Sequence, residues 1–173
     1  YASFDDTPEY IERVCVPAIK HCLTISKRLA MTPGNRCMWV YPRPADVGVW
    51  HNPCSTNRGK WGFSHVNAFI YFYGRDPLNV GRGMKPNSVS GLCDSVDDID
   101  HPCPKPLLFM RWLVGRASLD GETILDPFMG SGTTGVACMN LGRKFIGIEI
   151  ERKYFDIACE RIDNAQRQAR LFA

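Results

Sequence analysis

The chain has 173 residues, which is enough for one domain with a hydrophobic core. Apolar residues make up 45% and charged residues 23%, as in ordinary soluble proteins, and no apolar run approaches the ~20 residues of a membrane helix. The net charge of +3 permits an anionic partner but is too small for a strongly basic nucleic-acid binder.

Eight cysteines are spread along the chain without a C-x-x-C pair. A tetrahedral zinc site therefore has no sequence support, and we expect no metal site. The opening segment YASFDDTPEY is acidic and polar, unlike a secretory signal. We expect reduced thiols in a cytoplasmic protein rather than a disulfide framework.

The first half of the chain is predicted to hold one helix and three strands. The helix runs from Thr7 to about Leu29, with Pro8 in its first turn, and MTPGN (31–35) follows it. The predicted strands are RCMWVY (36–41), DVGVW (46–50) and the aromatic segment VNAFIYFYG (66–74). A polar loop at 51–65 joins the last two, and residues 75–100 form a second, longer loop.

The second half alternates between helix and strand. The expected elements are a helix at 105–116, a strand at 123–128, a helix at 133–142, a strand at 144–150 and a helix at 152–170. This order predicts an α/β fold with parallel strands and helices on the faces of the sheet.

A glycine-rich turn, GSGTTG (130–135), falls between the strand at 123–128 and the helix that follows. Its small residues let a ligand approach the backbone, and the helix N-terminus offers free N–H groups. Glu149, at the end of the next strand, can accept both hydroxyls of a ribose. These features fit NAD and S-adenosylmethionine equally well.

Three further features favour S-adenosylmethionine. Asp126 and Phe128 precede the turn, and a carboxylate with a bulky ring suits an ammonium and a sulfonium better than a pyrophosphate. Only one helix follows Glu149, which leaves no room for a second mononucleotide unit. HPCPKP (101–106) lies just upstream, and its Lys105 can face a carboxylate near the glycine turn.

Three ordered motifs resemble the amino-methylating DNA methyltransferases with permuted motif order, which act on N6 of adenine or N4 of cytosine. The H-P-x-x-K-P motif of that family matches residues 101–106, and its D-P-F-x-G-S-G-T-T motif matches residues 126–134 without a gap. Its acidic strand end matches Glu149. The resemblance is tight over residues 101–165 and looser over 31–74, where the sequence is similar to phage and prophage members.

The resemblance implies a single Rossmann-like S-adenosylmethionine-dependent methyltransferase domain over residues 1–173. Residues 1–74 would form the target-base half, 75–100 a short recognition or linker loop, and 101–173 the cofactor-binding half. The implied reaction flips a base out of double-stranded DNA and methylates its exocyclic amine, as restriction–modification enzymes do. Adenine is favoured over cytosine on family frequency alone, and the sequence predicts no oligomeric state.

The resemblance also implies the residues that bind S-adenosylmethionine. They are His101, Pro102, Lys105, Asp126, Phe128, Gly130, Ser131, Gly132, Thr133, Glu149 and Ile150. Phe128 and Gly130 would line the methionine portion, Glu149 would hold the ribose, and Ile150 would contact the adenine.

The catalytic D/N/S-P-P-Y/F/W motif of the family has no match in the 173 residues, so no catalytic residue is predicted. TPEY (7–10) is favoured as a helix start, and HNPC (51–54) lacks the second proline and the aromatic residue. We expect the motif, and a central strand beside 123–128, upstream of Tyr1 in the native protein. Two alternatives stay open: a cofactor-binding remnant or subunit that needs a partner chain, and an enzyme acting on RNA or protein.

Other residues divide between surface and core. Candidate DNA contacts are Arg58, Lys60 and Trp61, in a loop that mixes phosphate donors with aromatic rings, although a plain solvated loop fits as well. The basic residues Arg161, Arg167 and Arg170 of the last helix favour a solvated face. The tryptophans expected to pack in the core are Trp39, Trp50 and Trp112.

Overall fold

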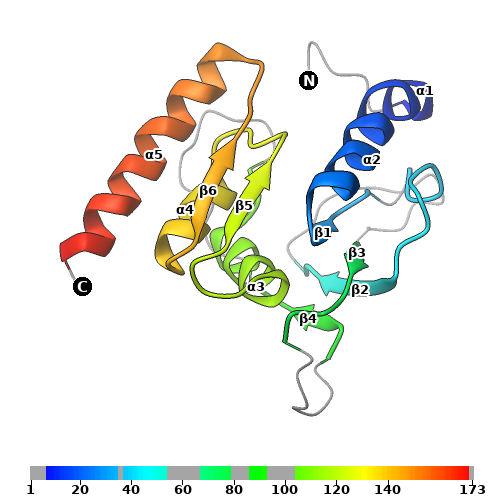
Figure 1. The fold of residues 1–173 in the computed structure, drawn as a ribbon, viewed down its shortest axis with the longest axis horizontal. Helices are drawn as coiled ribbons and strands as arrows, with labels where there is room; N and C mark the ends of the chain where they lie inside the picture. Colours follow the sequence, from blue (N-terminus) through cyan, green and yellow to red (C-terminus); the bar gives the residue numbers. More distant parts are fainter. Residues whose placement is uncertain (1–6, 35–36, 54–66, 79–85, 93–103, 172–173) are drawn as a thin grey trace. The chain divides into compact units, whose positions relative to one another are not determined.

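The computed structural model describes residues 7–34, 37–53, 67–78, 86–92 and 104–171. The chain forms two compact units, Tyr1–Gly91 and Leu92–Ala173, and each is described here by itself (Figure 1). Among the helices within the described ranges, none is both long enough and apolar enough to cross a lipid bilayer.

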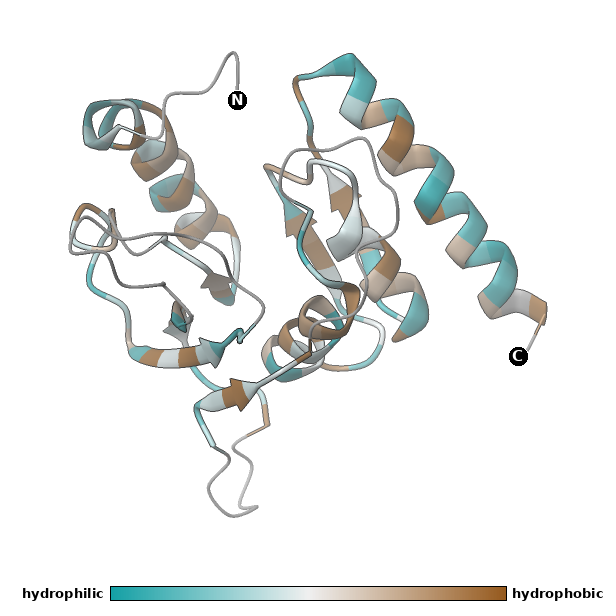
Figure 2. Cartoon of the chain, turned by 180° about the vertical axis from the view of Figure 1, so that it is seen from behind, coloured by the Kyte–Doolittle hydropathy of each residue, from teal (hydrophilic) through white to brown (hydrophobic). Residues whose placement is uncertain are grey.

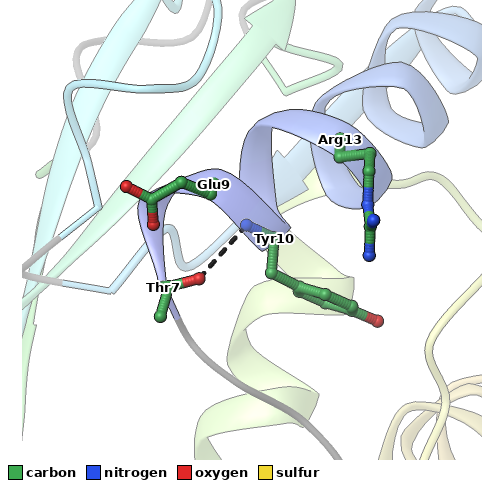
Figure 3. Close-up of a pocket in the computed structure, with 4 residues that line it drawn as sticks. All are labelled: Thr7, Glu9, Tyr10 and Arg13. Carbon is green, nitrogen blue, oxygen red and sulfur yellow. Dashed lines mark hydrogen bonds between the residues drawn. The ribbon is translucent and has the colours of Figure 1, made fainter.

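The first unit begins with a helix that changes its winding. It consists of α1 (Pro8–Tyr10), the π-helical segment η1 (Ile11–Cys15) and α2 (Val16–Ile25). Thr7 caps the start by accepting a 3.3 Å hydrogen bond from the Tyr10 backbone N–H (Figure 3). The wider turn accommodates Pro17, whose ring would clash with the carbonyl four residues earlier in a regular α-helix.

The helix ends earlier than the sequence pattern predicts. Ser26 has an extended backbone, and its N–H and hydroxyl both donate to the Cys22 carbonyl, at 3.0 and 2.7 Å. Strand β1 (Arg28–Met31) then begins, so the prediction of helix up to Leu29 is wrong. The Cys22 carbonyl thus keeps its helical N–H donor and gains the serine hydroxyl as a second donor at the end of the helix.

The strands of the first unit form a mixed four-stranded sheet in the order β1-β3-β2-β4. Its members besides β1 are β2 (Asp46–His51), β3 (Asn67–Gly74) and β4 (Ser88–Ser90). Strand β3 runs antiparallel to β1 and β2, while β4 runs parallel to β2. The strand predicted at 46–50 is confirmed, and the one predicted at 66–74 is confirmed over its described residues 67–74, whereas β4 lies in the segment predicted to be loop.

Residues 37–40 form a turn, so the strand predicted at 36–41 is wrong. The Val40 N–H donates to the Cys37 carbonyl at 3.1 Å. The Tyr71 hydroxyl, from β3, donates to the Met38 carbonyl at 2.8 Å. Cys37 packs against Ile11 and Val16 of the helix. Tertiary contacts therefore fold back a segment whose own composition favours a strand.

The tryptophans expected in the core have different environments. Trp39 lies in the turn and is 83% exposed, so its assignment to the core is wrong. Trp50 is buried, as predicted, and its indole N–H donates to the Gly91 carbonyl at 2.8 Å. Trp112 is half-buried and stacks on the buried ring of Phe109, with ring centroids 6.3 Å apart.

The second unit follows the predicted alternation of helix and strand. Its elements are α3 (Leu107–Ala117), β5 (Thr123–Asp126), α4 (Thr133–Asn140), β6 (Lys144–Gly147) and α5 (Arg152–Leu171) (Figure 1). Strands β5 and β6 are parallel, and α4 packs against both α3 and α5. In Figure 2, α5 is a largely hydrophilic helix with separate apolar bands. The α/β fold class is confirmed.

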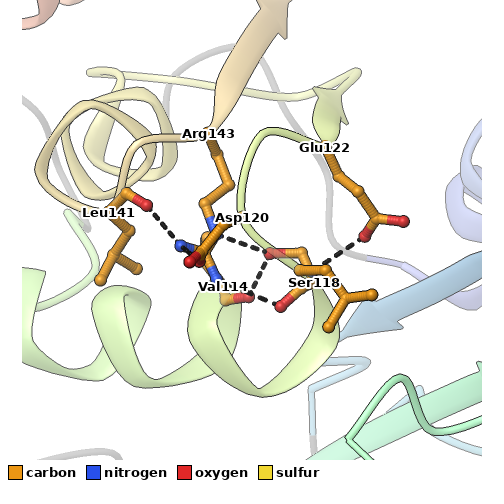
Figure 4. A network of polar contacts seen from close by, with 7 residues as sticks. Val114, Ser118, Asp120, Glu122, Leu141 and Arg143 are labelled. Carbon is orange, nitrogen blue, oxygen red and sulfur yellow. Dashed lines mark hydrogen bonds and ion pairs between the residues drawn. The ribbon is translucent and has the colours of Figure 1, made fainter.

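Arg143, whose side chain is 10% exposed, joins the turns that lead into the two parallel strands. Arg143 donates from Nε to the hydroxyl of Ser118 and from Nη2 to its carbonyl, each at 3.2 Å (Figure 4). Its Nη1 contacts the Leu141 carbonyl and the carboxylate of Asp120. The end of α3, the turn into β5 and the turn into β6 are therefore joined by one guanidinium group.

We predict that Arg143→Met lowers the free energy of unfolding by about 2–4 kcal/mol, because Ser118 is 1% exposed and loses a charged donor. The control is Asp120→Asn. The Asp120 side chain is 92% exposed, so its ion pair with Arg143 is worth about 0–1 kcal/mol. Urea unfolding of both variants measures the difference, and equal losses would contradict this account of the network.

Candidate functional site

The candidate site is the turn that connects β5 to α4. Gly130 and Gly132 have left-handed backbones, with φ of +52° and +79°. The Gly132 N–H donates to the Met129 carbonyl at 2.9 Å, and the Gly132 carbonyl accepts from Val136 at 3.0 Å to start α4. A methyl group on Gly132 would lie 2.8 Å from Cβ of Ala158 in α5. Glycine is thus required there by its backbone angle and by the close approach of α5.

Asp126, at the end of β5, ties the two ends of this turn together. One carboxylate oxygen accepts the backbone N–H of Phe128 at 3.0 Å, and the other accepts the hydroxyl of Thr134 at 2.6 Å. Burial raises the pKa of Asp126, and the nearby charge of Glu149 adds to this, while the two hydrogen bonds oppose it. Thr134, which was absent from the predicted site, is therefore the partner of a predicted site residue.

Glu149 lies beside the turn, as the motif spacing predicts. One of its carboxylate oxygens accepts the backbone N–H of Gly130 at 2.9 Å, and the other accepts the N–H of Glu151 at 2.9 Å. A carboxylate oxygen can accept two hydrogen bonds, so each of these oxygens keeps acceptor capacity for a ligand. The predicted glycine turn and the predicted acid therefore meet at one point on the carboxyl edge of the β5–β6 pair.

Arg161 of α5 also contacts the turn, although the sequence pattern predicts a solvated face for it. Its Nη1 donates to the Ser131 carbonyl at 2.5 Å and to the hydroxyls of Ser131 and Thr133 at 3.3 Å. Both of these partners are buried. The prediction that Arg161 faces solvent is therefore wrong. A sequence signal for its position did exist, because Arg161 lies three residues after the buried Ala158 and residues three apart share one face of a helix.

Apolar side chains are exposed around the same edge of the strands. Phe128 is 52% exposed, Ile148 is 54% exposed and Ile150 is 84% exposed. Ligands of open α/β sheets bind outside the carboxyl ends of the strands, so these side chains stand where an apolar or aromatic part of a ligand is expected.

The other predicted residues are placed less fully. Lys105 is exposed and precedes α3 by two residues. His101 and Pro102 lie outside the described residues, as do the candidate DNA contacts Arg58, Lys60 and Trp61.

The fold and the turn define a Rossmann-like α/β protein with a glycine turn and an acidic residue at the carboxyl edge of two parallel strands. A family model described as DNA methylase, of the N6/N4 type, matches residues 79–160. The matched segment, just under half of the chain, is therefore similar to the N6/N4 DNA methylases.

Two curated relatives match over 135 residues, which are 75% of this chain and 50% of each relative. The type II methyltransferase M2.LlaDCHI of Lactococcus lactis subsp. cremoris is 46% identical, and M2.DpnII of Streptococcus pneumoniae is 33% identical. The chain thus spans about half the length of these relatives.

Solved structures show the same fold. The crystal structure of the M1.HpyAVI–SAM complex has a TM-score of 0.59 and 23% identity over 90% of this chain and 81% of that one. The PvuII DNA methyltransferase, which is cytosine-N4-specific, has a TM-score of 0.56 and 16% identity over 96% of this chain and 66% of that one.

We predict that Gly132→Ala destabilises the protein more than Gly121→Ala. Both glycines have a left-handed backbone, at φ of +79° and +74°, so each variant loses about 1–2 kcal/mol to backbone strain. A methyl group at Gly121 meets nothing within 4 Å, whereas one at Gly132 meets Ala158 and adds about 1–3 kcal/mol. Thermal or urea unfolding compares the two variants. An equal loss of unfolding free energy in both would contradict the prediction, because it would mean that α5 moves away from the added methyl group at no cost.

Proposed function

We propose that the protein binds S-adenosylmethionine and transfers its methyl group to an exocyclic amine of a base in DNA, with N6 of adenine favoured over N4 of cytosine. The observation that carries the proposal is the 2.9 Å hydrogen bond from the Gly130 amide to the Glu149 carboxylate. It brings the glycine turn and the acidic strand end together in the arrangement that holds an adenosine-bearing cofactor. The similarity of residues 79–160 to the N6/N4 DNA methylase family and the names of the type II methyltransferase relatives support the same reading.

The proposed cofactor lies along the carboxyl edge of β5 and β6. Glu149 accepts its ribose hydroxyls, Ile150 packs on its adenine, and Phe128 contacts its methionine portion. The turn from Gly130 to Thr133 supplies close backbone approach, because its side chains are small. Lys105, with His101 and Pro102, closes over the amino-acid end. When bound, S-adenosylmethionine supplies an electrophilic methyl group on a positively charged sulfur.

The charge of this edge discriminates between the two cofactors that the glycine turn permits. Asp126 and Glu149 each bind the turn through a carboxylate, and these two groups contribute a negative field at this edge. Such a field favours a sulfonium and an ammonium, and it disfavours the pyrophosphate of NAD. The proposal therefore includes a preference for S-adenosylmethionine over NAD.

The DNA half of the proposal concerns residues 1–74 and the segment at 75–100. We assign the target base to the first of these and sequence recognition to the second. The base leaves the duplex before its amine attacks, since the amine cannot reach the methyl group from inside the stack. Arg58, Lys60 and Trp61 are the proposed DNA contacts, and the D/N/S-P-P-Y motif of the family is the expected holder of the flipped base. Because such an enzyme modifies bacterial or phage DNA, the proposed location of the protein is the cytoplasm.

Titration calorimetry with S-adenosylmethionine and with NAD tests the cofactor site. We expect S-adenosylmethionine to bind more tightly, and Glu149→Gln to weaken it about 10- to 100-fold because an amide cannot accept through both of its atoms. Glu151→Gln is the matched control, since its side chain is exposed and only its backbone N–H contacts Glu149. Tighter binding of NAD would end the methyltransferase proposal.

Methyl transfer tests the substrate. The full-length gene product is incubated with radiolabelled S-adenosylmethionine and either duplex DNA or RNA, and the modified bases are identified after hydrolysis. We expect N6-methyladenine in DNA. Preferential labelling of RNA would overturn the choice of substrate, and cofactor binding without any transfer would overturn the enzymatic assignment.

A further inference from the structure

The glycine-rich segment packs closely against α5. A methyl group on Gly132 would meet Ala158, as described above, and one on Gly135 would overlap the side chain of Ile162. These α5 residues share one face with Ala165, which is also buried. Gly132 in the turn and Gly135 at the start of α4 therefore both lie close against α5.

Arg161 lies on this face and supplies the polar part of the contact. Its Nη1 reaches three oxygens: the carbonyl and hydroxyl of Ser131 and the hydroxyl of Thr133. Ser131 and Thr133 are 3% and 5% exposed, so solvent cannot replace these bonds well. They flank Gly132 on both sides, and the guanidinium therefore holds the left-handed residue by its two neighbours.

The planarity of the peptide bond transmits the effect of Arg161 to the Gly132 and Gly130 amides of the turn. The Ser131 carbonyl that Arg161 binds belongs to the same peptide unit as the Gly132 N–H. That N–H closes the tight turn on the Met129 carbonyl, and the turn presents the Gly130 amide to Glu149. When Arg161 fixes the Ser131 carbonyl, it therefore also fixes the hydrogen bond from Gly132 to Met129 and the one from Gly130 to Glu149.

We propose that Arg161 is a positioning residue for the cofactor: it does not touch the ligand but holds the turn in the conformation that receives the amino-acid portion. This inference rests on the proposed function. Other arginines of α5 differ from it. Arg152 pairs with Asp156 one turn along at 2.9 Å on the exposed surface, and the Arg167 side chain is exposed.

The test compares Arg161→Met, which keeps much of the aliphatic stem, with Arg161→Lys, which keeps the charge and one directed donor. Arg167→Met is the matched control on the same helix. Calorimetry gives the affinity for S-adenosylmethionine. Competition gives the affinity for 5′-methylthioadenosine, which has the adenosine part and lacks the amino-acid part. Circular dichroism and urea unfolding establish that each variant is folded.

We expect Arg161→Met to bind S-adenosylmethionine about tenfold or more weakly, with Arg161→Lys in between and Arg167→Met unchanged. Binding of 5′-methylthioadenosine is expected to stay as in the wild type, whereas Glu149→Gln weakens both ligands. A general structural defect would weaken both ligands in Arg161→Met as well, and that result would overturn the positioning role. Unchanged affinity for S-adenosylmethionine in Arg161→Met would overturn it too.

Hydrogen exchange of the amides at 130–134 gives a readout that needs no ligand. We expect faster exchange in Arg161→Met than in the wild type or in Arg167→Met, and equal exchange would contradict the inference. If Arg161→Met does not fold, ligand affinity and hydrogen exchange are both measured on Arg161→Lys instead. A wild-type protein that binds no S-adenosylmethionine would overturn the proposed function, whereas a wild type that binds it and a Met variant that binds equally would overturn this inference alone.

Discussion

The hydrogen bond from the Gly130 amide to the Glu149 carboxylate joins the two chain segments that form the site. It can form only because the backbone between β5 and α4 adopts left-handed angles at two glycines, which a residue with a side chain adopts at a cost. The same angles bring Gly132 onto Ala158, so the shape of the turn and the packing of α5 are one constraint. The exposed apolar side chains at the strand ends are placed by this turn and by β6.

The charged side chains around the turn differ in what they bind. Asp126 and Arg161 face inward and bind the turn itself, through the Phe128 amide and the Thr134 hydroxyl on one side and through Ser131 on the other. Glu149 also binds the turn but retains acceptor capacity toward the strand edge. Burial of the Asp126 carboxylate raises its pKa, and its two hydrogen bonds to the turn oppose that shift.

Strong local patterns were enough to predict much of this structure. The apolar spacing of α5 and the β-branched and aromatic run of β3 predicted these elements closely, and the motif spacing predicted that the glycine turn and Glu149 would meet. Contacts between distant segments were not predictable in this way. The 37–40 turn arises from packing of Cys37 on the first helix, which no local propensity encodes. The role of Arg161 depends on which face of α5 meets the turn, and charged residues of a helix ordinarily favour the solvated face.

The strand pair that carries the turn has open apolar surface. Ile146 and Ile148 are each 54% exposed, and among the described strands β5 pairs with β6 alone. A two-stranded sheet is marginally stable in isolation, and an apolar strand with an unpaired edge associates with other chains. A fragment cut near the boundary at Leu92 would therefore self-associate during purification. Truncation is for this reason a poor route to a small soluble version of the second unit, and its expression would call for a solubility-enhancing fusion.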